Sequence, residues 1–77
     1  MEEKVLEMLV KITDEESIKE DININLFEND ILDSLGFTEL LVSIDEEFNI
    51  EISPTEISRE EIDTPAKIIE LIKNKSK

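Results

Sequence analysis

Ser34 is the residue whose type and position could support covalent chemistry in this chain. It follows two apolar residues and the acid Asp33, and a helical pattern then runs from Leu35 to Phe48. The start of a helix carries partial positive charge and N–H groups without intrahelical partners, so it tolerates a phosphate ester. Serine is also one of the commonest N-cap residues, and capping alone could account for Ser34. The sequence on both sides leads us to favour the other reading, in which Ser34 attaches a phosphate-linked prosthetic arm.

Composition excludes several kinds of enzyme chemistry. The 77 residues include no cysteine and no histidine, so thiol nucleophiles, thiolate metal sites and the commonest general base are missing. A hydrolase built on Ser34 would need a lysine or a carboxylate to activate the hydroxyl. No lysine lies between Glu20 and Ser58. We therefore expect no catalytic residue, and any thiol chemistry must use a thiol supplied by modification.

The charge is strongly negative and unevenly distributed. There are 21 acids against 8 bases, for a formal net charge of −13. Such a surface disfavours nucleic acid and anionic membranes, and it attracts partners with basic patches. From Glu20 to Ser58, with both ends included, there are eleven acids and no base. This segregation predicts a one-signed negative field around Ser34, which we interpret as a docking surface rather than as a solubility device.

The location we expect is the cytoplasm. No apolar run is long enough to span a bilayer, and residues 1–4 lack the basic start and apolar continuation of a signal peptide.

Apolar spacing predicts an all-α fold in a single domain over residues 1–77. The expected helices are Glu2 to Thr13, Leu35 to Phe48, and a last helix that begins at Thr64-Pro65 and ends near Lys73, Lys75 and Lys77. We expect a compact bundle of these three main helices with a short helix before the last. The apolar stripes that would face the core are Val5, Leu9 and Ile12; Phe37, Leu41, Ile44 and Phe48; and Ile68, Leu71 and Ile72.

Two long connections need their own anchors. Residues 14–33 would fold back over the core through Leu26, Phe27, Ile31 and Leu32, with a helical turn near residues 15–19. After the second helix, Ser58 and Glu61 have the spacing of a capping box, which predicts the short helical element. The isoleucines expected to seat this second connection are Ile50, Ile52, Ile57 and Ile62.

Gly36, the only glycine, has two competing explanations. Its missing side chain either lets another group approach Ser34 or serves as a tolerated filler in the first helical turn.

The first connection also carries an incomplete calcium pattern. Asp21, Asn23 and Asn25 match the first three ligand positions of a calcium-binding loop. The positions that require a glycine and a bidentate glutamate hold Leu26 and Leu32, so we expect no metal site.

The triplet Asp33-Ser34-Leu35, followed by an acidic amphipathic helix, resembles the acyl carrier protein superfamily. The resemblance covers nearly the whole chain. It implies that a phosphopantetheinyl transferase esterifies Ser34 with 4′-phosphopantetheine, whose thiol then holds an acyl or aminoacyl group as a thioester. It also implies a non-catalytic, monomeric carrier that docks its enzymes through the second helix. The implied docking residues are Asp33, Leu35, Gly36, Glu39, Asp45 and Glu46.

Within the superfamily, the chain is most similar to the D-alanyl carrier branch of lipoteichoic acid modification. Residues 25–36 and 58–69 carry this likeness. That branch usually has an acid where Ser58 stands and a tryptophan where Ile62 stands, whereas fatty-acid carriers usually have an acid where Gly36 stands. The likeness implies loading by an ATP-dependent D-alanine ligase, or a ligase for another amino or acyl group, and transfer by a membrane-bound acyltransferase. The alternative is a carrier for fatty-acid, polyketide or peptide assembly.

Overall fold

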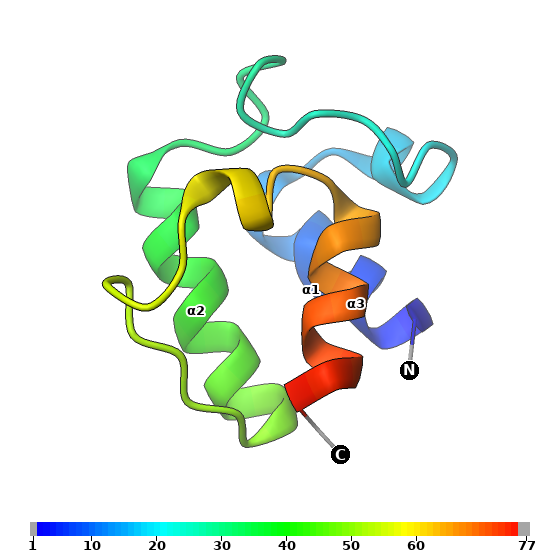
Figure 1. Cartoon of the computed structure of the whole chain (residues 1–77). Coiled ribbons are helices and arrows are strands. Elements are labelled where there is room, and N and C mark those ends of the chain that lie inside the picture. The colour runs from blue at the N-terminus through cyan, green and yellow to red at the C-terminus, as the bar shows by residue number, and fades with distance from the viewer. Residues whose placement is uncertain (1, 76–77) are drawn as a thin grey trace.

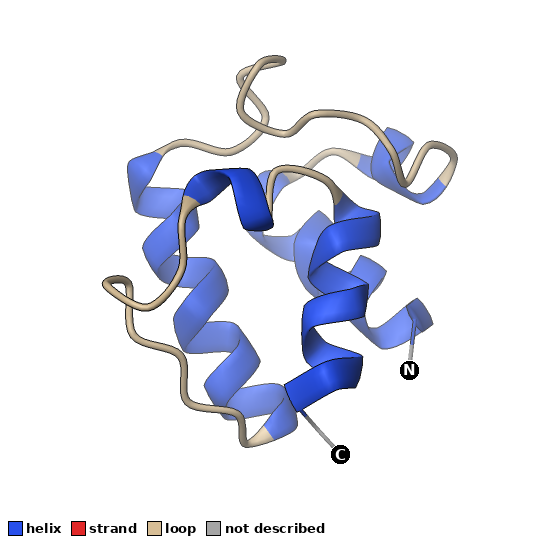
Figure 2. Ribbon diagram, in the orientation of Figure 1, coloured by secondary structure: helices blue, strands red, loops and turns tan. Residues whose placement is uncertain are grey.

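A computed structural model describes residues 2–75. Lys77, which the sequence placed at the end of the last helix, lies outside the described residues, as do Met1 and Ser76. The helices are α1 (Glu2–Thr13), α2 (Ser34–Phe48) and α3 (Pro65–Lys75), with the short 3-10 helices η1 (Glu16–Lys19) and η2 (Arg59–Glu61) in the connections. No strand occurs in the described part of the chain, so the predicted all-α class is confirmed (Figures 1 and 2).

The three α-helices surround one apolar core. α1 packs against both α2 and α3 (Figure 1). Six of the ten residues in the predicted stripes are buried in this core, and four of these, Val5, Leu9, Ile44 and Ile72, have no exposed surface. The other four stripe residues pack against the core and are partly buried. The four isoleucines expected in the second connection are all buried as well. The buried hydrophobic residues are Val5, Met8, Leu9, Ile18, Leu26, Leu32, Leu40, Leu41, Ile44, Ile50, Ile52, Ile57, Ile62, Ile68, Ile69 and Ile72.

The short helix predicted before α3 is smaller than a full α-helix. Residues 54–56 form only a turn, and η2 is a single 3-10 turn of three residues. Its capping box is present, since the Ser58 N–H donates to Glu61 Oε1 at 3.2 Å. A 3-10 turn is the usual form of so short a piece.

The first connection arches over the end of the bundle where α2 begins (Figure 1). It is held by backbone bonds to the far end of the chain: Leu26 N–H donates to Asp63 O at 2.7 Å, and Ala66 N–H donates to Ile22 O at 2.8 Å. Leu26 and Leu32 are buried anchors, as predicted, while Phe27 and Ile31 are half-buried. Ile18 in η1 is a further, fully buried anchor that the sequence did not single out.

α2 begins one residue earlier than the apolar pattern predicted. Asp33 is its N-cap, and the Asp33 carboxylate accepts a hydrogen bond from the Gly36 N–H at 2.8 Å. The interpretation of Ser34 as the cap is therefore wrong: Ser34 is the first residue of the helix. An aspartate caps as well as a serine does and adds a favourable charge at the positive end of the helix dipole.

Within residues 2–75, no helix combines the length and the apolar character needed to cross a membrane.

Candidate functional site around Ser34

Ser34 lies at the solvent-exposed head of α2. Because Asp33 caps the helix, the Ser34 hydroxyl is not needed to satisfy the N–H groups of the first turn. The Ser34 side chain is exposed. The geometry therefore presents this hydroxyl to any molecule that docks at the end of the bundle.

Arg59 is the partner that the fold brings to this hydroxyl. Its Nη2 donates a hydrogen bond to Ser34 Oγ at 2.6 Å, across 25 positions of sequence. Arg59 is the first residue of η2 and the only arginine in the chain. The expected one-signed negative field around Ser34 is therefore wrong at the hydroxyl itself, where a guanidinium lies.

An aromatic pair supports the guanidinium. The Arg59 Cζ atom lies 5.3 Å from the centroid of the Phe27 ring, which is the range of a cation–π contact. Phe27 in turn meets Phe37 of α2 edge to face, with centroids 6.5 Å apart. Phe27 was predicted only as a core anchor; it also positions the charged group beside Ser34.

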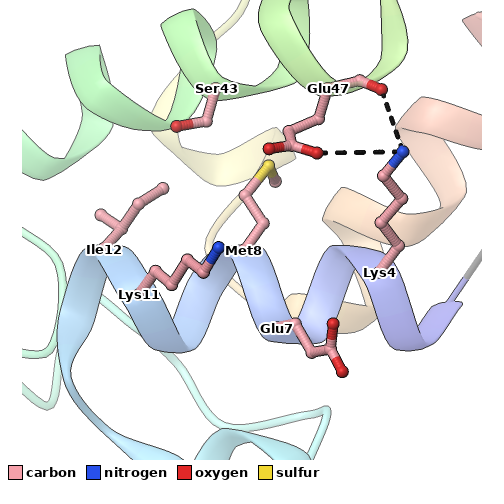
Figure 3. Close-up of a pocket in the computed structure, with 7 residues that line it drawn as sticks. All are labelled: Lys4, Glu7, Met8, Lys11, Ile12, Ser43 and Glu47. Carbon is pink, nitrogen blue, oxygen red and sulfur yellow. Dashed lines mark hydrogen bonds and ion pairs between the residues drawn. The ribbon is translucent and has the colours of Figure 1, made fainter.

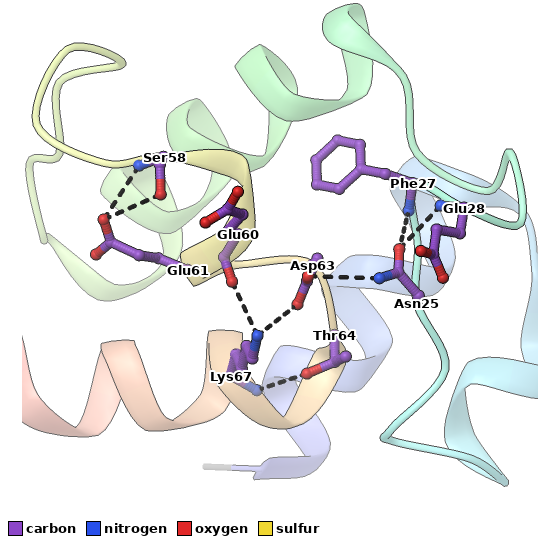
Figure 4. A network of polar contacts seen from close by, with 9 residues as sticks. All are labelled: Asn25, Phe27, Glu28, Ser58, Glu60, Glu61, Asp63, Thr64 and Lys67. Carbon is purple, nitrogen blue, oxygen red and sulfur yellow. Dashed lines mark hydrogen bonds and ion pairs between the residues drawn. The ribbon is translucent and has the colours of Figure 1, made fainter.

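A polar network links the first connection to the segment between η2 and α3 (Figure 4). The Asn25 side-chain oxygen accepts hydrogen bonds from the N–H groups of Phe27, at 3.0 Å, and Glu28, at 2.8 Å. The Asn25 amide donates to Asp63 at 3.4 Å, which ties the first connection to the segment before α3. On the other side of Asp63, Lys67 Nζ forms a 2.9 Å ion pair with its carboxylate. The loop that carries Phe27 and the segment that follows Arg59 are thus linked through Asp63.

This arrangement orients a hydroxyl without activating it. Arginine stays protonated in proteins and cannot accept a proton. Its hydrogen bond uses a lone pair of Oγ and leaves the hydroxyl proton free to be given to another base. Any base that activates Ser34 must therefore come from a group other than Arg59.

The predicted docking residues divide into two groups. Leu35, Glu39 and Glu46 are exposed and fall on one line of α2, at i, i+4 and i+11. Val42, at i+7 on the same line, is 52% exposed and was not predicted, while Leu35 is 76% exposed. These four residues are called the α2 stripe below. Asp45 is also exposed, but it lies on the flank that faces Glu51 and Pro54.

The other two predicted docking residues have structural tasks. Asp33 is the cap of α2, although its side chain is exposed. Gly36 is half-buried, and a Cβ added there would meet the Leu32 Cδ1 atom at 2.7 Å. The contact with the buried Leu32 side chain gives a third explanation for this glycine, beside the two that the sequence offered.

A hollow of about 180 Å³ lies between α1 and α2 (Figure 3). Charged side chains make up much of its lining, and Lys4 bridges it by a hydrogen bond to the Glu47 carbonyl at 3.3 Å. Its lining residues are Lys4, Glu7, Met8, Lys11, Ile12, Ser43 and Glu47.

The incomplete calcium pattern is used for local turns. Asp21 Oδ1 accepts from the Asn23 N–H at 3.1 Å, and Asn25 caps the next turn as described above. Within residues 2–75, histidine, cysteine, aspartate and glutamate form no group of three or more that could hold a metal ion.

The fold and the exposed serine define the class of the protein: an acyl-carrier-like helical bundle with an exposed serine hydroxyl at the head of α2, the longest helix among residues 2–75. A family model described as the phosphopantetheine attachment site matches residues 3–72.

Curated relatives narrow this class. The D-alanyl carrier protein of Abiotrophia defectiva is 44% identical over 75 residues, covering 97% of this chain and 95% of the relative. That of Bacillus velezensis is 40% identical over 67 residues, covering 87% and 86%. The D-alanyl carrier protein 1 of Lactiplantibacillus plantarum is 39% identical over 70 residues, covering 91% and 86%. The chain therefore belongs to the phosphopantetheine attachment family and, within it, to the D-alanyl carrier proteins. Both steps of the predicted resemblance are confirmed.

Proposed function

We propose that residues 1–77 act as one carrier domain, that Ser34 bears the 4′-phosphopantetheine arm, and that the arm holds D-alanine for the D-alanylation of teichoic acid. The observation that carries this proposal is the position of Ser34, exposed at the head of α2 and not occupied with capping. It lies within the residues matched by the attachment-site family. The cargo follows from the relatives, which are named for the D-alanyl group.

The attachment step requires only a hydroxyl from this chain. Ser34 Oγ forms a bond to the phosphorus of the phosphopantetheinyl group of coenzyme A, the pyrophosphate bond breaks, and adenosine 3′,5′-bisphosphate leaves. The hydroxyl proton passes to a base of the transferase, because the group bonded to Ser34 here is an arginine. When bound, the arm supplies the thiol that a chain without cysteine lacks, and that thiol holds the cargo as a thioester.

The proposed partners are enzymes rather than nucleic acid. A phosphopantetheinyl transferase modifies the chain, an ATP-dependent D-alanine ligase loads it, and a membrane-bound acyltransferase unloads it. The carrier itself catalyses no step and works as a cytoplasmic monomer. The formal net charge of −13 supports partners with basic surfaces, because opposite charges speed their encounter.

We propose that these enzymes dock on the α2 stripe. Along this stripe, the exposed apolar side chains of Leu35 and Val42 alternate with the carboxylates of Glu39 and Glu46. Reversing both charges, in Glu39→Lys with Glu46→Lys, should slow transfer to Ser34 and weaken its salt dependence. The same rates in the parent and the doubly reversed chain would place the docking surface elsewhere.

The test of attachment is the intact mass after incubation with coenzyme A and a broad-specificity transferase. The parent chain should gain one phosphopantetheinyl group and Ser34→Ala should gain none. Ser43→Ala is the matched control, because Ser43 lies on the same helix and should not affect the gain. A Ser34→Ala chain that still gains mass would refute the assignment. Loading of the modified chain by a D-alanine ligase, compared with fatty-acid and peptide-synthesis loading enzymes, then tests the cargo.

A further inference from the structure

The only arginine of the chain lies against the hydroxyl proposed for modification. Its Nη2 is 2.6 Å from Ser34 Oγ, and its guanidinium lies over the Phe27 ring. We propose that Arg59 binds the phosphodiester that links the arm to Ser34, and that Phe27 orients the guanidinium for this task. This inference rests on the proposed attachment at Ser34.

Esterification of Ser34 should change the oxygen to which Arg59 donates, because the unmodified and modified chains offer different acceptors. In the unmodified chain, the hydroxyl oxygen is a good acceptor, and Arg59 uses it. After esterification, Oγ becomes a bridging oxygen and the negative charge resides on the two non-bridging oxygens of the phosphate. These oxygens lie two bonds from Oγ, through the phosphorus, and a small rotation of the Arg59 side chain would reach them. A guanidinium presents its donors as a planar fork that fits two such oxygens.

The guanidinium is already ordered before any phosphate arrives. It lies 5.3 Å from the Phe27 centroid, and Phe27 is held by the edge contact with Phe37 and by Asn25 at its backbone N–H. At the other end, the capping box that closes η2 fixes the backbone of Arg59. A group that is ordered in advance loses less conformational freedom on binding.

The negative charge of the surrounding surface favours a base at position 59. A phosphodiester adds negative charge to a surface that holds Asp33 beside Ser34 and no base from Glu20 to Ser58. The stability of the unmodified fold does not explain the contact well, because a hydrogen bond between two exposed side chains contributes little. Binding of the arm's phosphate accounts for both the position and the type of the residue.

The experiment uses nuclear magnetic resonance of the full chain before and after modification, with the intact mass measured first. A single arginine gives a single Nε–H resonance, and the modified protein contains a single phosphorus. In the modified chain, the Arg59 Nε–H resonance should shift. The ³¹P resonance should differ from that of a short unstructured phosphopantetheinyl-serine peptide.

Four variants test the assignment. Arg59→Gln should move the ³¹P resonance to the position of the unstructured peptide, and Arg59→Lys, which keeps the charge without the fork, should fall between that position and the parent. Phe27→Leu keeps an apolar anchor and removes the ring, so it should shift the ³¹P resonance part of the way. Lys4→Gln is the matched control: Lys4 lies 5.2 Å from the Phe48 centroid at the other end of α2, and its loss changes the net charge equally. It should leave the ³¹P resonance in place.

The outcomes separate this inference from the proposed function. If the parent chain gains no mass, the proposed attachment fails and the inference fails with it. If it gains the group but Arg59→Gln leaves the ³¹P resonance unchanged, or Lys4→Gln moves it as far, then only the role of Arg59 is refuted. A slower gain of mass by Arg59→Gln with an unchanged ³¹P resonance would likewise refute phosphate binding and assign Arg59 to transferase docking. Because Arg59 is exposed, the variants should keep the fold, which their amide spectra would verify.

Discussion

Asp33 and Ser34 perform separate tasks at the start of α2. Asp33 caps the helix through the Gly36 N–H, and its backbone carbonyl accepts from the Phe37 N–H at 2.8 Å. Ser34 is thereby left with a hydroxyl whose one side-chain hydrogen bond within residues 2–75 comes from Arg59. A serine that also served as the cap would have to break that bond before it could react.

We predict that Asp33→Ala lowers the free energy of unfolding by about 1 kcal/mol, because the first-turn N–H group loses its acceptor. Asp33→Asn should retain most of the stability, since an asparagine oxygen caps comparably. Urea unfolding measures both. Glu39→Ala, on the exposed face of the same helix, is the control and should change stability little. Equal stability of the parent and Asp33→Ala would show that the cap contributes nothing.

Gly36 and Leu32 should be energetically coupled. A Cβ at position 36 would lie 2.7 Å from the Leu32 Cδ1 atom, and Leu32 is only 3% exposed, so its side chain has little room to move. Without that clash, alanine is better than glycine in a helix by up to about 1 kcal/mol.

A double-mutant cycle measures this coupling. Gly36→Ala should be less favourable in the parent than in a Leu32→Ala background, where the space is open. An effect of Gly36→Ala that is the same in both backgrounds would show that Leu32 is not what requires the glycine.

At the scale of elements, the first connection behaves as a part of the core rather than as a free loop. Two buried leucines, and backbone hydrogen bonds to residues 63 and 66, hold it across the end of the bundle. Asn25 organises the middle of it by accepting from two successive residues, Phe27 and Glu28. The position of the Phe27 ring, and through it that of Arg59, depends on this turn.

We predict that Asn25→Ala destabilises the fold by about 1–3 kcal/mol, the range for removing the acceptor of partly buried donors. Amide hydrogen exchange should quicken most over residues 26–32 and less in α1. Asn25→Asp keeps the acceptor but places a second carboxylate beside Asp63, so it should rescue only part of the loss. The same amide protection of residues 26–32 in the parent and in Asn25→Ala would show that the buried leucines alone hold the first connection.

At the scale of the whole molecule, the net negative charge destabilises the compact folded state. Like charges at a formal net charge of −13 repel one another more strongly when the chain is folded into a small volume. Ion pairs offset this only locally, as between Lys4 and Glu47 at 3.8 Å, with both side chains about half exposed. The acidity therefore lowers the stability of the fold, and the docking proposed for the α2 stripe gives a reason for keeping it.

We predict that the melting temperature rises with sodium chloride between about 0.01 M and about 0.5 M, because salt over this range shortens the screening length several-fold. The double charge reversal Glu39→Lys with Glu46→Lys raises the net charge by four, to −9, and should reduce the slope. Scanning calorimetry in salt and in the chloride of a bulky organic cation would separate screening from specific cation binding. A melting temperature independent of salt would contradict the repulsion argument.

Much of the fold could be predicted because its signals are local. The bounds of α1, the cap and proline that begin α3, and the isoleucines of the second connection follow from spacing and capping within a few residues. The position of Ser34 at the head of an amphipathic helix was predicted in the same way. Ile18 was missed because one apolar residue in an acidic stretch has no periodicity to mark it.

The charge beside Ser34 could be decided only by tertiary structure. Arg59 is 25 positions away, and its approach depends on how two irregular connections pack over the end of the bundle. The composition shows that the chain has one arginine, but it does not show that this arginine contacts Ser34. The choice of Asp33 over Ser34 as the cap was also open, because the two residues are adjacent and both types are good N-caps. The sequence by itself determined that a hydroxyl stands at the head of a helix in an acidic chain; the packing of distant segments decided which charge it meets.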